Sequence, residues 1–267
     1  MKTASIVCLG KSVAVFEFGN ASNPAILLIH GNSAHSGFFI PMIRLLELNY
    51  HIITLDLPGH RQSEAWEKED FTRENMALLF NSVLDYFKIS EVNAFGFSMG
   101  GLILLECFDL IPGIKKLAVA GHPPLSSVTD MPEAYNLTED VSLYLQGPLS
   151  DKEIERIYNA VIAIDNDQLK AEIKEGLRQT SPSFREGCLL MAQNVSDQVE
   201  KLNLLMHPIA IIHATDDLAI RLDYLKKLRI NNLWKQEIQL ISDCGHFMIA
   251  EKPTELASML DQFFSEN

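Results

Sequence analysis

The segment Gly96-Phe97-Ser98-Met99-Gly100 places a serine between two glycines. It includes the end of residues 92–97, which have the composition of a short buried strand, and it precedes residues 102–110, which have the pattern of a helix. A sharp turn of small residues between a strand and a helix lifts a serine hydroxyl clear of the sheet. The segment therefore predicts that Ser98 is the nucleophile of an acyl transfer.

A serine hydroxyl is a weak nucleophile at neutral pH, so Ser98 requires a general base. The chain has eight histidines, and only His246 lies in a loop between a late strand and the final helix. Such a loop would lie at the carboxyl edge of the sheet, where the Ser98 hydroxyl is also expected. We therefore expect His246 to take the proton from Ser98.

The base in turn requires an acid that orients its ring. The strand expected over residues 209–214 ends in a turn that contains Asp216 and Asp217. Neighbouring residues of a turn point in different directions, so only one of these carboxylates can accept a hydrogen bond from His246. The residues alone leave both open, and we expect the other to cap a helix that begins near Ala219.

Acyl transfer also requires N–H donors for the oxygen that becomes negative in the transition state. The backbone amide of Met99, directly after the nucleophile and at the start of a helix, is expected to supply one. The second is expected from Asn32, because Gly31 lets the main chain approach closely in the loop after residues 25–30.

Short apolar runs alternate with helical patterns from about residue 25 onward. This alternation predicts an α/β fold with a mostly parallel central sheet flanked by helices on both faces. The expected core strands are residues 25–30, 50–56, 92–97, 114–120, 209–214 and 237–241, preceded by an antiparallel pair over residues 5–9 and 13–18. The expected helices include residues 72–88, capped by Thr72, and residues 254–264, entered through Pro253.

The strand pattern stops over residues 122–206, where helical patterns and turn residues follow one another. Ser150-x-x-Glu153 and Ser183-x-x-Glu186 both match the capping box, which satisfies free amides at a helix start. We therefore expect a helical lid, inserted after the sixth strand.

Composition excludes several classes of protein. The 267 residues are 47% hydrophobic and 21% charged, which suits one core domain, expected over residues 1–121 and 207–267. The net charge of −13 disfavours binding to nucleic acid or to anionic membranes. No apolar run approaches the roughly 18 residues of a membrane span, and no signal-peptide core is recognisable, so we expect a cytoplasmic protein. Four widely spaced cysteines predict reduced, mostly buried thiols.

Taken together, these segments resemble the α/β-hydrolase superfamily over nearly the whole chain. The matching segments are His30-Gly31-Asn32 for the oxyanion loop, Asp56-Leu57-Pro58-Gly59-His60 for the turn after the next strand, residues 96–100 for the nucleophile elbow and Gly245-His246-Phe247 for the histidine loop. The segment His213-Ala214-Thr215-Asp216-Asp217 is similar to the family's His-Gly-x-x-Asp, with Ala214 in place of the usual glycine. The resemblance therefore implies Asp217 as the acid.

The resemblance further implies hydrolysis of a carboxylic ester or a lactone through an acyl-enzyme, with no cofactor and no metal. Haloalkane dehalogenases and epoxide hydrolases use an aspartate nucleophile, so Ser98 disfavours them. C–C bond hydrolases usually carry Asn and Trp where this chain has Phe97 and Phe247, which leaves that class a weak alternative. A cofactor-free oxygenase and a non-catalytic, receptor-like binding protein are the alternatives from other classes.

The substrate pocket is expected between lid and core, with mostly apolar walls. Its expected residues are Gly31, His35, Phe38, His122 and Phe247. A short or medium acyl ester suits this composition, and an acyl-homoserine lactone lies within the range of the family. We expect a small-molecule substrate as the partner, with no nucleic acid and no membrane insertion, and leave a homodimer open.

Overall fold

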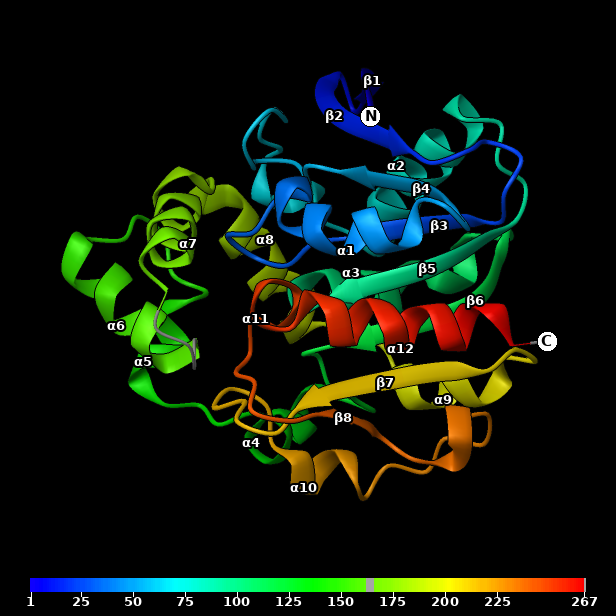
Figure 1. Cartoon of the computed structure of the whole chain (residues 1–267). Helices are drawn as coiled ribbons and strands as arrows, with labels where there is room; N and C mark the ends of the chain where they lie inside the picture. Colours follow the sequence, from blue (N-terminus) through cyan, green and yellow to red (C-terminus); the bar gives the residue numbers. More distant parts are fainter. Residues whose placement is uncertain (162–165, 267) are drawn as a thin grey trace.

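The computed structural model describes residues 1–161 and 166–266, in which eight strands form one sheet (Figure 1). The strands are β1 (Lys2–Cys8), β2 (Lys11–Phe18), β3 (Ala25–Ile29), β4 (His51–Leu55), β5 (Val92–Phe97), β6 (Ile114–Ala120), β7 (Ile209–Ala214) and β8 (Gln239–Ile241). Their order in the sheet is β1-β2-β4-β3-β5-β6-β7-β8. Strand β2 pairs antiparallel with both β1 and β4, and the other pairs are parallel.

The central strands are buried along their whole length. Every residue of β3, β4, β5 and β7 is buried, whereas β1 at the edge of the sheet alternates toward solvent at its carboxyl end. Continuous apolar strands of this kind are expected where helices cover both faces of a parallel sheet. The α/β class and the antiparallel lead-in pair predicted from the sequence are therefore confirmed, although β8 begins two residues later than expected.

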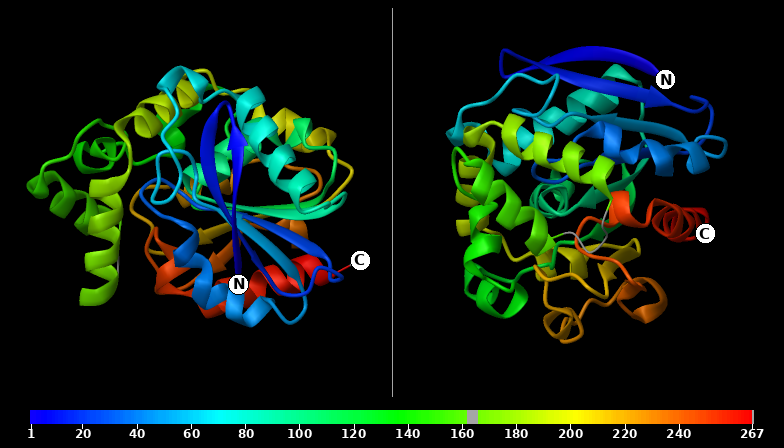
Figure 2. Two further views of the ribbon diagram at one scale, coloured as in Figure 1. Left: turned by 90° about the horizontal axis from the view of Figure 1, so that it is seen from above. Right: turned by 60° about the vertical axis from the view of Figure 1, so that its left-hand side comes forward.

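Helices cover the sheet on both faces (Figure 2). One face carries α1 (Ile40–Leu46), α11 (Met248–Glu251) and α12 (Pro253–Ser265), and the other carries α2 (Arg73–Tyr86), α3 (Met99–Cys107) and α9 (Gln198–Leu204). As predicted, the Thr72 hydroxyl caps α2 by accepting the Asn75 amide at 3.2 Å, and Pro253 opens α12. The short helix α10 (Leu222–Leu225) follows β7.

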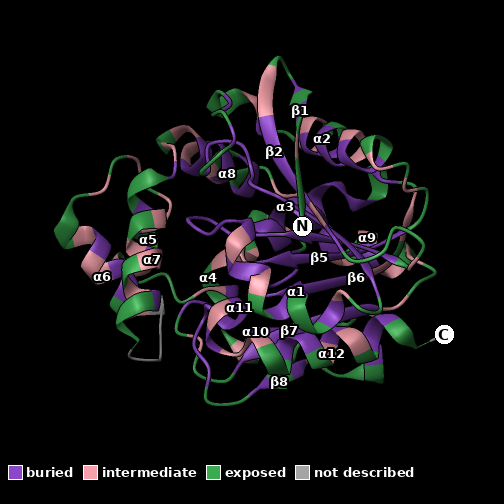
Figure 3. Ribbon diagram, turned by 45° about the horizontal axis from the view of Figure 1, so that its top comes forward, coloured by how far each residue is buried: buried purple, intermediate pink, exposed green. Residues whose placement is uncertain are grey.

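A run of helices separates β6 from β7, and the part of it before α9 lies beyond the carboxyl ends of the strands (Figure 1). Before α9 it contains α4 (Met131–Ala134), α5 (Glu139–Leu143), α6 (Asp151–Val161), α7 (Asp167–Gln179) and α8 (Pro182–Gln193). We call residues 122–206 the lid, of which residues 162–165 lie outside the described residues, as does residue 267 of the core. Figure 3 shows that the outer helices of the lid expose more of their surface than the strands do.

The two predicted capping boxes of the lid have different outcomes. The first is formed, because the Ser150 amide donates to the Glu153 carboxylate at 2.7 Å and the Glu153 amide donates to the Ser150 hydroxyl. The second prediction is wrong, because Ser183 lies inside α8 and the residue that precedes the helix is Ser181. The physical reason is Pro182, whose fixed φ suits the first position of a helix and moves the start forward.

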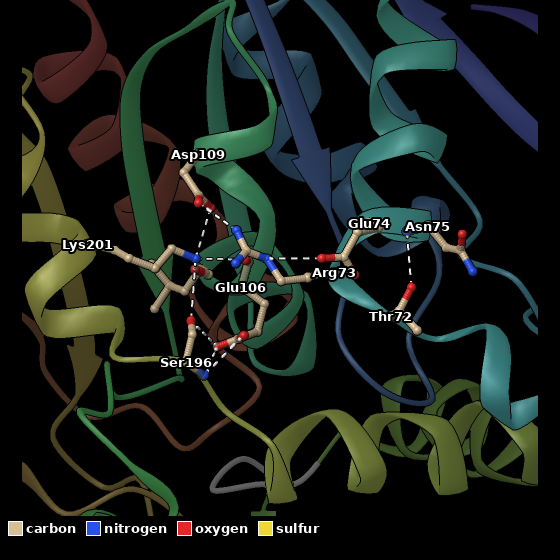
Figure 4. A network of polar contacts seen from close by, with 9 residues as sticks. Thr72, Arg73, Glu74, Asn75, Glu106, Asp109, Ser196 and Lys201 are labelled. Carbon is tan, nitrogen blue, oxygen red and sulfur yellow. Dashed lines mark hydrogen bonds and ion pairs between the residues drawn. The ribbon is translucent and has the colours of Figure 1, made fainter.

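Where the chain leaves the lid and rejoins the core, it makes polar contacts with residues around the end of α3 (Figure 4). The buried Glu106 carboxylate accepts hydrogen bonds from the amide and the hydroxyl of Ser196, each at 3.2 Å. Asp109 pairs with Lys201 of α9 at 2.9 Å and with Arg73 of α2 at 2.5 Å. These contacts attach the point where the lid rejoins the core to the helix that follows Ser98.

Two expectations drawn from composition concern the cysteines and membrane spans. All four cysteines are free and buried, as the sequence predicts, and burial raises the pKa of the Cys107 and Cys188 thiols. Among the helices of residues 1–161 and 166–266, none combines the length and the apolar character needed to cross a membrane.

Candidate active site

Ser98 lies at a strained turn between β5 and α3. Its φ of 51° and ψ of −120° are conformations that residues with a side chain rarely adopt. The turn requires small neighbours, because a Cβ on Gly96 would lie 2.6 Å from the Gly100 carbonyl oxygen, and one on Gly100 would lie 2.5 Å from that of Ile29. The Ser98 amide donates to the Ala120 carbonyl oxygen of β6 at 2.7 Å. The surrounding backbone therefore holds the hydroxyl in place.

A continuous chain of hydrogen bonds connects Ser98 with His246 and Asp217. The Ser98 Oγ lies 2.9 Å from His246 Nε2, and His246 Nδ1 lies 2.8 Å from Asp217 Oδ2. The side chain of Asp217 is fully buried and that of His246 is 7% exposed. The three groups come from the ends of β5 and β7 and from the loop after β8, so the structure brings together all three predicted residues.

The two aspartates at the end of β7 have separate environments. Asp217 turns inward, and its Oδ1 accepts the amides of Ala219 at 2.8 Å and Ile220 at 3.1 Å. Asp216 is exposed. The expectation that the second aspartate caps a helix near Ala219 is wrong, because Asp217 itself accepts these amides and α10 begins only at Leu222. The Asp217 carboxylate thus accepts hydrogen bonds both from the His246 imidazole and from the backbone of the turn after β7.

The electrostatic environment of the pair favours an imidazole that readily takes a proton. Burial alone would lower the pKa of His246, but the nearby Asp217 carboxylate outweighs burial and raises this pKa above its usual value. Burial alone would raise the pKa of Asp217, but the charge of His246 and the hydrogen bonds from His246 and from the Ala219 amide lower it. These shifts favour an ionised Asp217 beside an imidazole that can accept a proton.

We expect activity to be lost on the acid side with a midpoint above pH 6.5, the usual pKa of histidine. Only the neutral imidazole can accept the Ser98 proton, so kcat/KM falls as the pH falls through the raised pKa of His246. The measurement is the pH profile of kcat/KM on an uncharged ester. In Asp217→Asn the residual activity should show this midpoint at lower pH, because the carboxylate that raises the pKa is gone. An unshifted midpoint in this variant would contradict the assignment.

Glu251 of α11 holds the loop that carries His246. Its carboxylate accepts the amide of Gly245 at 3.1 Å and that of Phe247 at 3.0 Å, and the residue is 8% exposed. The amides on both sides of His246 are thereby fixed from the core, and the Glu251 charge also contributes to raising the pKa of His246. Glu251 could not be predicted from the sequence, because a glutamate in a helical segment carries no sign that it faces inward.

The two predicted oxyanion donors flank the nucleophile. Among the described residues, the backbone N–H groups of Asn32 and Met99 donate to no acceptor in a turn, loop or cap. Met99 is the first residue of α3, where helix amides lack an intrahelical partner and favour negative charge. A Cβ on Gly31 would lie 2.9 Å from Ser98 Cβ, so the loop after β3 touches the nucleophile turn. The arrangement can receive a negative oxygen beside Ser98.

A cavity of about 470 Å³ opens beside Ser98 and His246, between the core and the lid. No Asp, Glu, Lys or Arg side chain is among the described residues that line it. The lining residues are Ser98, Met99, Leu102, Gly121, His122, Met131, Tyr135, Leu137, Val141, Ser142, Tyr144, Leu145, Gln146, Leu189, Ala192, Gln193, Ala219, Ile220 and His246. The walls are thus uncharged and mostly apolar.

Of the predicted pocket residues, His122 lines the cavity. Its Nδ1 lies 2.9 Å from the hydroxyl of Tyr135, and burial lowers the pKa of His122 to about 3. The ring is therefore neutral and contributes a polar but uncharged wall.

Four other predicted pocket residues do not line the cavity. Phe38 and Phe247 pack against each other in the core, with ring centroids 5.1 Å apart. The His35 ring accepts the Gly37 amide with Nδ1 at 3.0 Å and places Nε2 3.4 Å from Glu172 of the lid. Gly31 touches the nucleophile turn, as described above. These residues occupy the expected loops, but none of them is among the described residues that line the cavity.

The residues missing from the sequence prediction come mainly from the lid and from the turn after β7. Tyr135 and Tyr144 contribute rings, and Ala219 and Ile220 contribute the wall next to Asp217. Tyr135 and Ile220 also form an isolated antiparallel bridge between the lid and this turn. Nothing in their local sequence distinguishes these side chains from ordinary core residues, so no pattern could have identified them.

Comparison with known proteins gives consistent similarities. A family model described as alpha/beta hydrolase fold matches residues 24–253. Mouse monoacylglycerol lipase ABHD6 is 23% identical and the match covers 91% of this chain and 76% of that protein. The uncharacterized hydrolase YugF of Bacillus subtilis (strain 168) is also 23% identical, with 95% and 94% covered. The solved structure of the N-acyl homoserine lactonase AidH complexed with N-butanoyl homoserine has a TM-score of 0.89 at 22% identity, covering 99% of this chain and 96% of that chain. The fold is therefore shared with AidH.

Proposed function

The chain belongs to the α/β hydrolase fold family, and from this premise we propose that it is a serine hydrolase of uncharged carboxylic esters or lactones. The observation that carries the proposal is the unbroken chain of contacts from Ser98 Oγ through His246 to Asp217, at 2.9 and 2.8 Å. Both distances are those of hydrogen bonds, so proton transfer needs no rearrangement. Fold similarity alone would not carry this conclusion.

In the proposed reaction, Ser98 Oγ attacks the carbonyl carbon while His246 Nε2 takes the hydroxyl proton. The ionised Asp217 carboxylate accepts a hydrogen bond from His246 Nδ1–H and stabilises the imidazolium. The amides of Asn32 and Met99 donate to the oxygen that becomes negative. His246 returns the proton to the leaving alcohol, and an acyl group remains on Ser98. Water activated by His246 then releases the acid and restores the serine.

The cavity supports an uncharged, largely apolar substrate. A charged acyl group would lose its hydration without gaining an ionic partner among the described lining residues, and this desolvation is costly. Short and medium acyl esters and acyl-homoserine lactones meet the requirement. The named activities of the relatives, a monoacylglycerol lipase and an N-acyl homoserine lactonase, also concern esters that carry acyl chains.

The test is a panel of substrates offered to the purified protein. It contains p-nitrophenyl esters of increasing chain length, an N-acyl homoserine lactone, and p-nitrophenyl butyrate beside p-nitrophenyl hemisuccinate as a pair matched in length. We expect kcat/KM to be at least about 10-fold higher for the butyrate than for the hemisuccinate, because only the latter brings a charge into the cavity. Equal rates for this pair would contradict the proposed selectivity.

The same preparation distinguishes the other classes of function. A fluorophosphonate should label the wild-type protein, since this probe reacts with an activated serine. Absence of both labelling and turnover would instead favour a receptor-like protein. Oxygen consumption without ester hydrolysis would favour a cofactor-free oxygenase.

A further inference from the structure

Three separate segments of the lid converge on the loop of Asn32 and Ser33, which carries one proposed oxyanion donor. They contain Tyr144 directly after α5, Gly176 in α7 and Arg185 in α8. These lid segments contact Asn32 and Ser33, whereas the preceding Gly31 lies against Ser98. The lid therefore touches the catalytic machinery as well as the substrate cavity.

Tyr144 and Asn32 form a reciprocal pair of hydrogen bonds. The Tyr144 hydroxyl donates to the Asn32 carbonyl oxygen at 3.0 Å, and Asn32 Nδ2 donates to the Tyr144 carbonyl oxygen at 2.6 Å. Burial raises the pKa of Tyr144, so the hydroxyl keeps its proton and remains a donor. The pair fixes both the main chain and the side chain of Asn32.

Arg185 extends this support to the neighbouring residue. Its guanidinium donates to Ser33 Oγ at 3.3 Å and to the Leu177 carbonyl oxygen at 2.5 Å, and Ser33 Oγ donates to Asn32 Oδ1 at 3.1 Å. The residue is 2% exposed and has no carboxylate within 4.0 Å among the described residues. A buried cation without a countercharge is costly unless its donors are used. Here the two terminal nitrogens donate to neutral atoms of the lid and of this loop, whereas Nε has no partner among the described residues.

The contact between α7 and Ser33 is a close backbone approach. A Cβ on Gly176 would lie 2.1 Å from the Ser33 carbonyl oxygen, so no residue with a side chain fits there without movement. Ser33 has a φ of 59°, a left-handed conformation that costs energy and persists only where its surroundings hold it. Ser33 is thus held by α7, by Arg185 and by its amide, which donates to His60 Nε2 at 3.3 Å.

The core supplies little of the support for Asn32. Among the described residues, each hydrogen bond found for Asn32 is made with Tyr144 or with the adjacent Ser33. We propose that Tyr144 and Arg185 are positioning residues, which hold Asn32 so that its amide faces the reacting oxygen. The inference rests on the proposed function, because it assigns a purpose to the orientation of that amide.

The test compares Tyr144→Phe with the wild type and with Tyr224→Phe. The first variant keeps the ring that lines the cavity and removes only the hydroxyl. The control removes a tyrosine hydroxyl elsewhere, which donates to the Pro124 carbonyl oxygen at 2.9 Å and lies 3.4 Å from Asp130 Oδ2. Arg185→Lys is the second test variant, because lysine keeps the charge but not the planar array of donors.

Two readouts are measured on each protein. Hydrogen exchange of the peptide that contains Ser33 and Ala34 should become at least about 5-fold faster in Tyr144→Phe and Arg185→Lys, and stay unchanged in the control. On p-nitrophenyl butyrate, kcat should fall about 10-fold in both test variants while KM changes by less than about 2-fold, because a misplaced donor weakens transition-state binding.

The outcomes separate this inference from the proposed function. Unchanged exchange in Tyr144→Phe overturns the inference whether or not the wild type is active. Faster exchange with unchanged kcat also overturns it, because the loop would then move without effect on catalysis. A wild-type protein that hydrolyses no ester and is not labelled by a fluorophosphonate contradicts the proposed function. The role assigned to the Asn32 amide then fails as well. Hydrogen exchange still reports, in that case, whether Tyr144 holds the loop.

Discussion

Ser98→Ala should lower kcat on p-nitrophenyl butyrate by about 10⁴-fold to 10⁶-fold and abolish labelling by a fluorophosphonate. The substitution removes the only atom that can form the acyl-enzyme, while the oxyanion donors and the cavity remain. Alanine has the same Cβ, so the strained turn between β5 and α3 is retained. The folded state should therefore survive, and circular dichroism should match that of the wild type.

The control for this variant is Ser82→Ala. The Ser82 hydroxyl donates to the Leu78 carbonyl oxygen within α2, away from the site, so its loss should leave kcat and labelling unchanged. Full esterase activity in Ser98→Ala would contradict the proposed mechanism. Appreciable turnover with oxygen consumption in that variant would point to an oxygenase that uses His246 and Asp217 without the serine.

Asp217→Asn should lower kcat by about 10⁴-fold, whereas Asp216→Asn should change it by less than about 2-fold. Asparagine at position 217 can present its amide to His246 Nδ1 and so favour the tautomer that cannot accept the Ser98 proton. It also removes the charge that stabilises the imidazolium. Asp216 is exposed, and its carboxylate contacts neither His246 nor the amides after β7.

The two aspartate variants control for each other, since both remove one negative charge from the same turn. Steady-state kinetics measure both variants on the alkaline plateau of the wild-type pH profile, where the neutral imidazole can accept the Ser98 proton. A large loss in Asp216→Asn together with a small loss in Asp217→Asn would contradict the geometric assignment. A loss of similar size in both would indicate that the turn itself, rather than one carboxylate, is required.

Helix α3 illustrates how local prediction can miss the start of an element. The apolar pattern alone indicates a start at residue 102, whereas the helix begins at Met99, where the turn after Ser98 already implies a helix start. Gly100 and Gly101 are poor helix formers, so they hide the start from a pattern based on propensity. Both lie where another element comes close, since a Cβ on Gly101 would lie 3.0 Å from His122. Packing against distant strands thus overrides the local preference.

The α/β class and the groups proposed for the chemistry could be predicted from the residues alone. The sequence patterns that indicate them are local, since Gly96 and Gly100 are both needed within one turn. The groups are expected to meet because parallel strands bring their carboxyl ends to one edge of a sheet. The residues alone leave Asp216 and Asp217 open, and only the family resemblance favours Asp217. The walls of the cavity and the support of Asn32 by Tyr144 and Arg185 became visible only with the chain folded. These features depend on where side chains point and on how the lid packs on the core. The contacts of Tyr144 with Asn32 and of Arg185 with Ser33 join residues more than 100 positions apart, and no short sequence pattern encodes them.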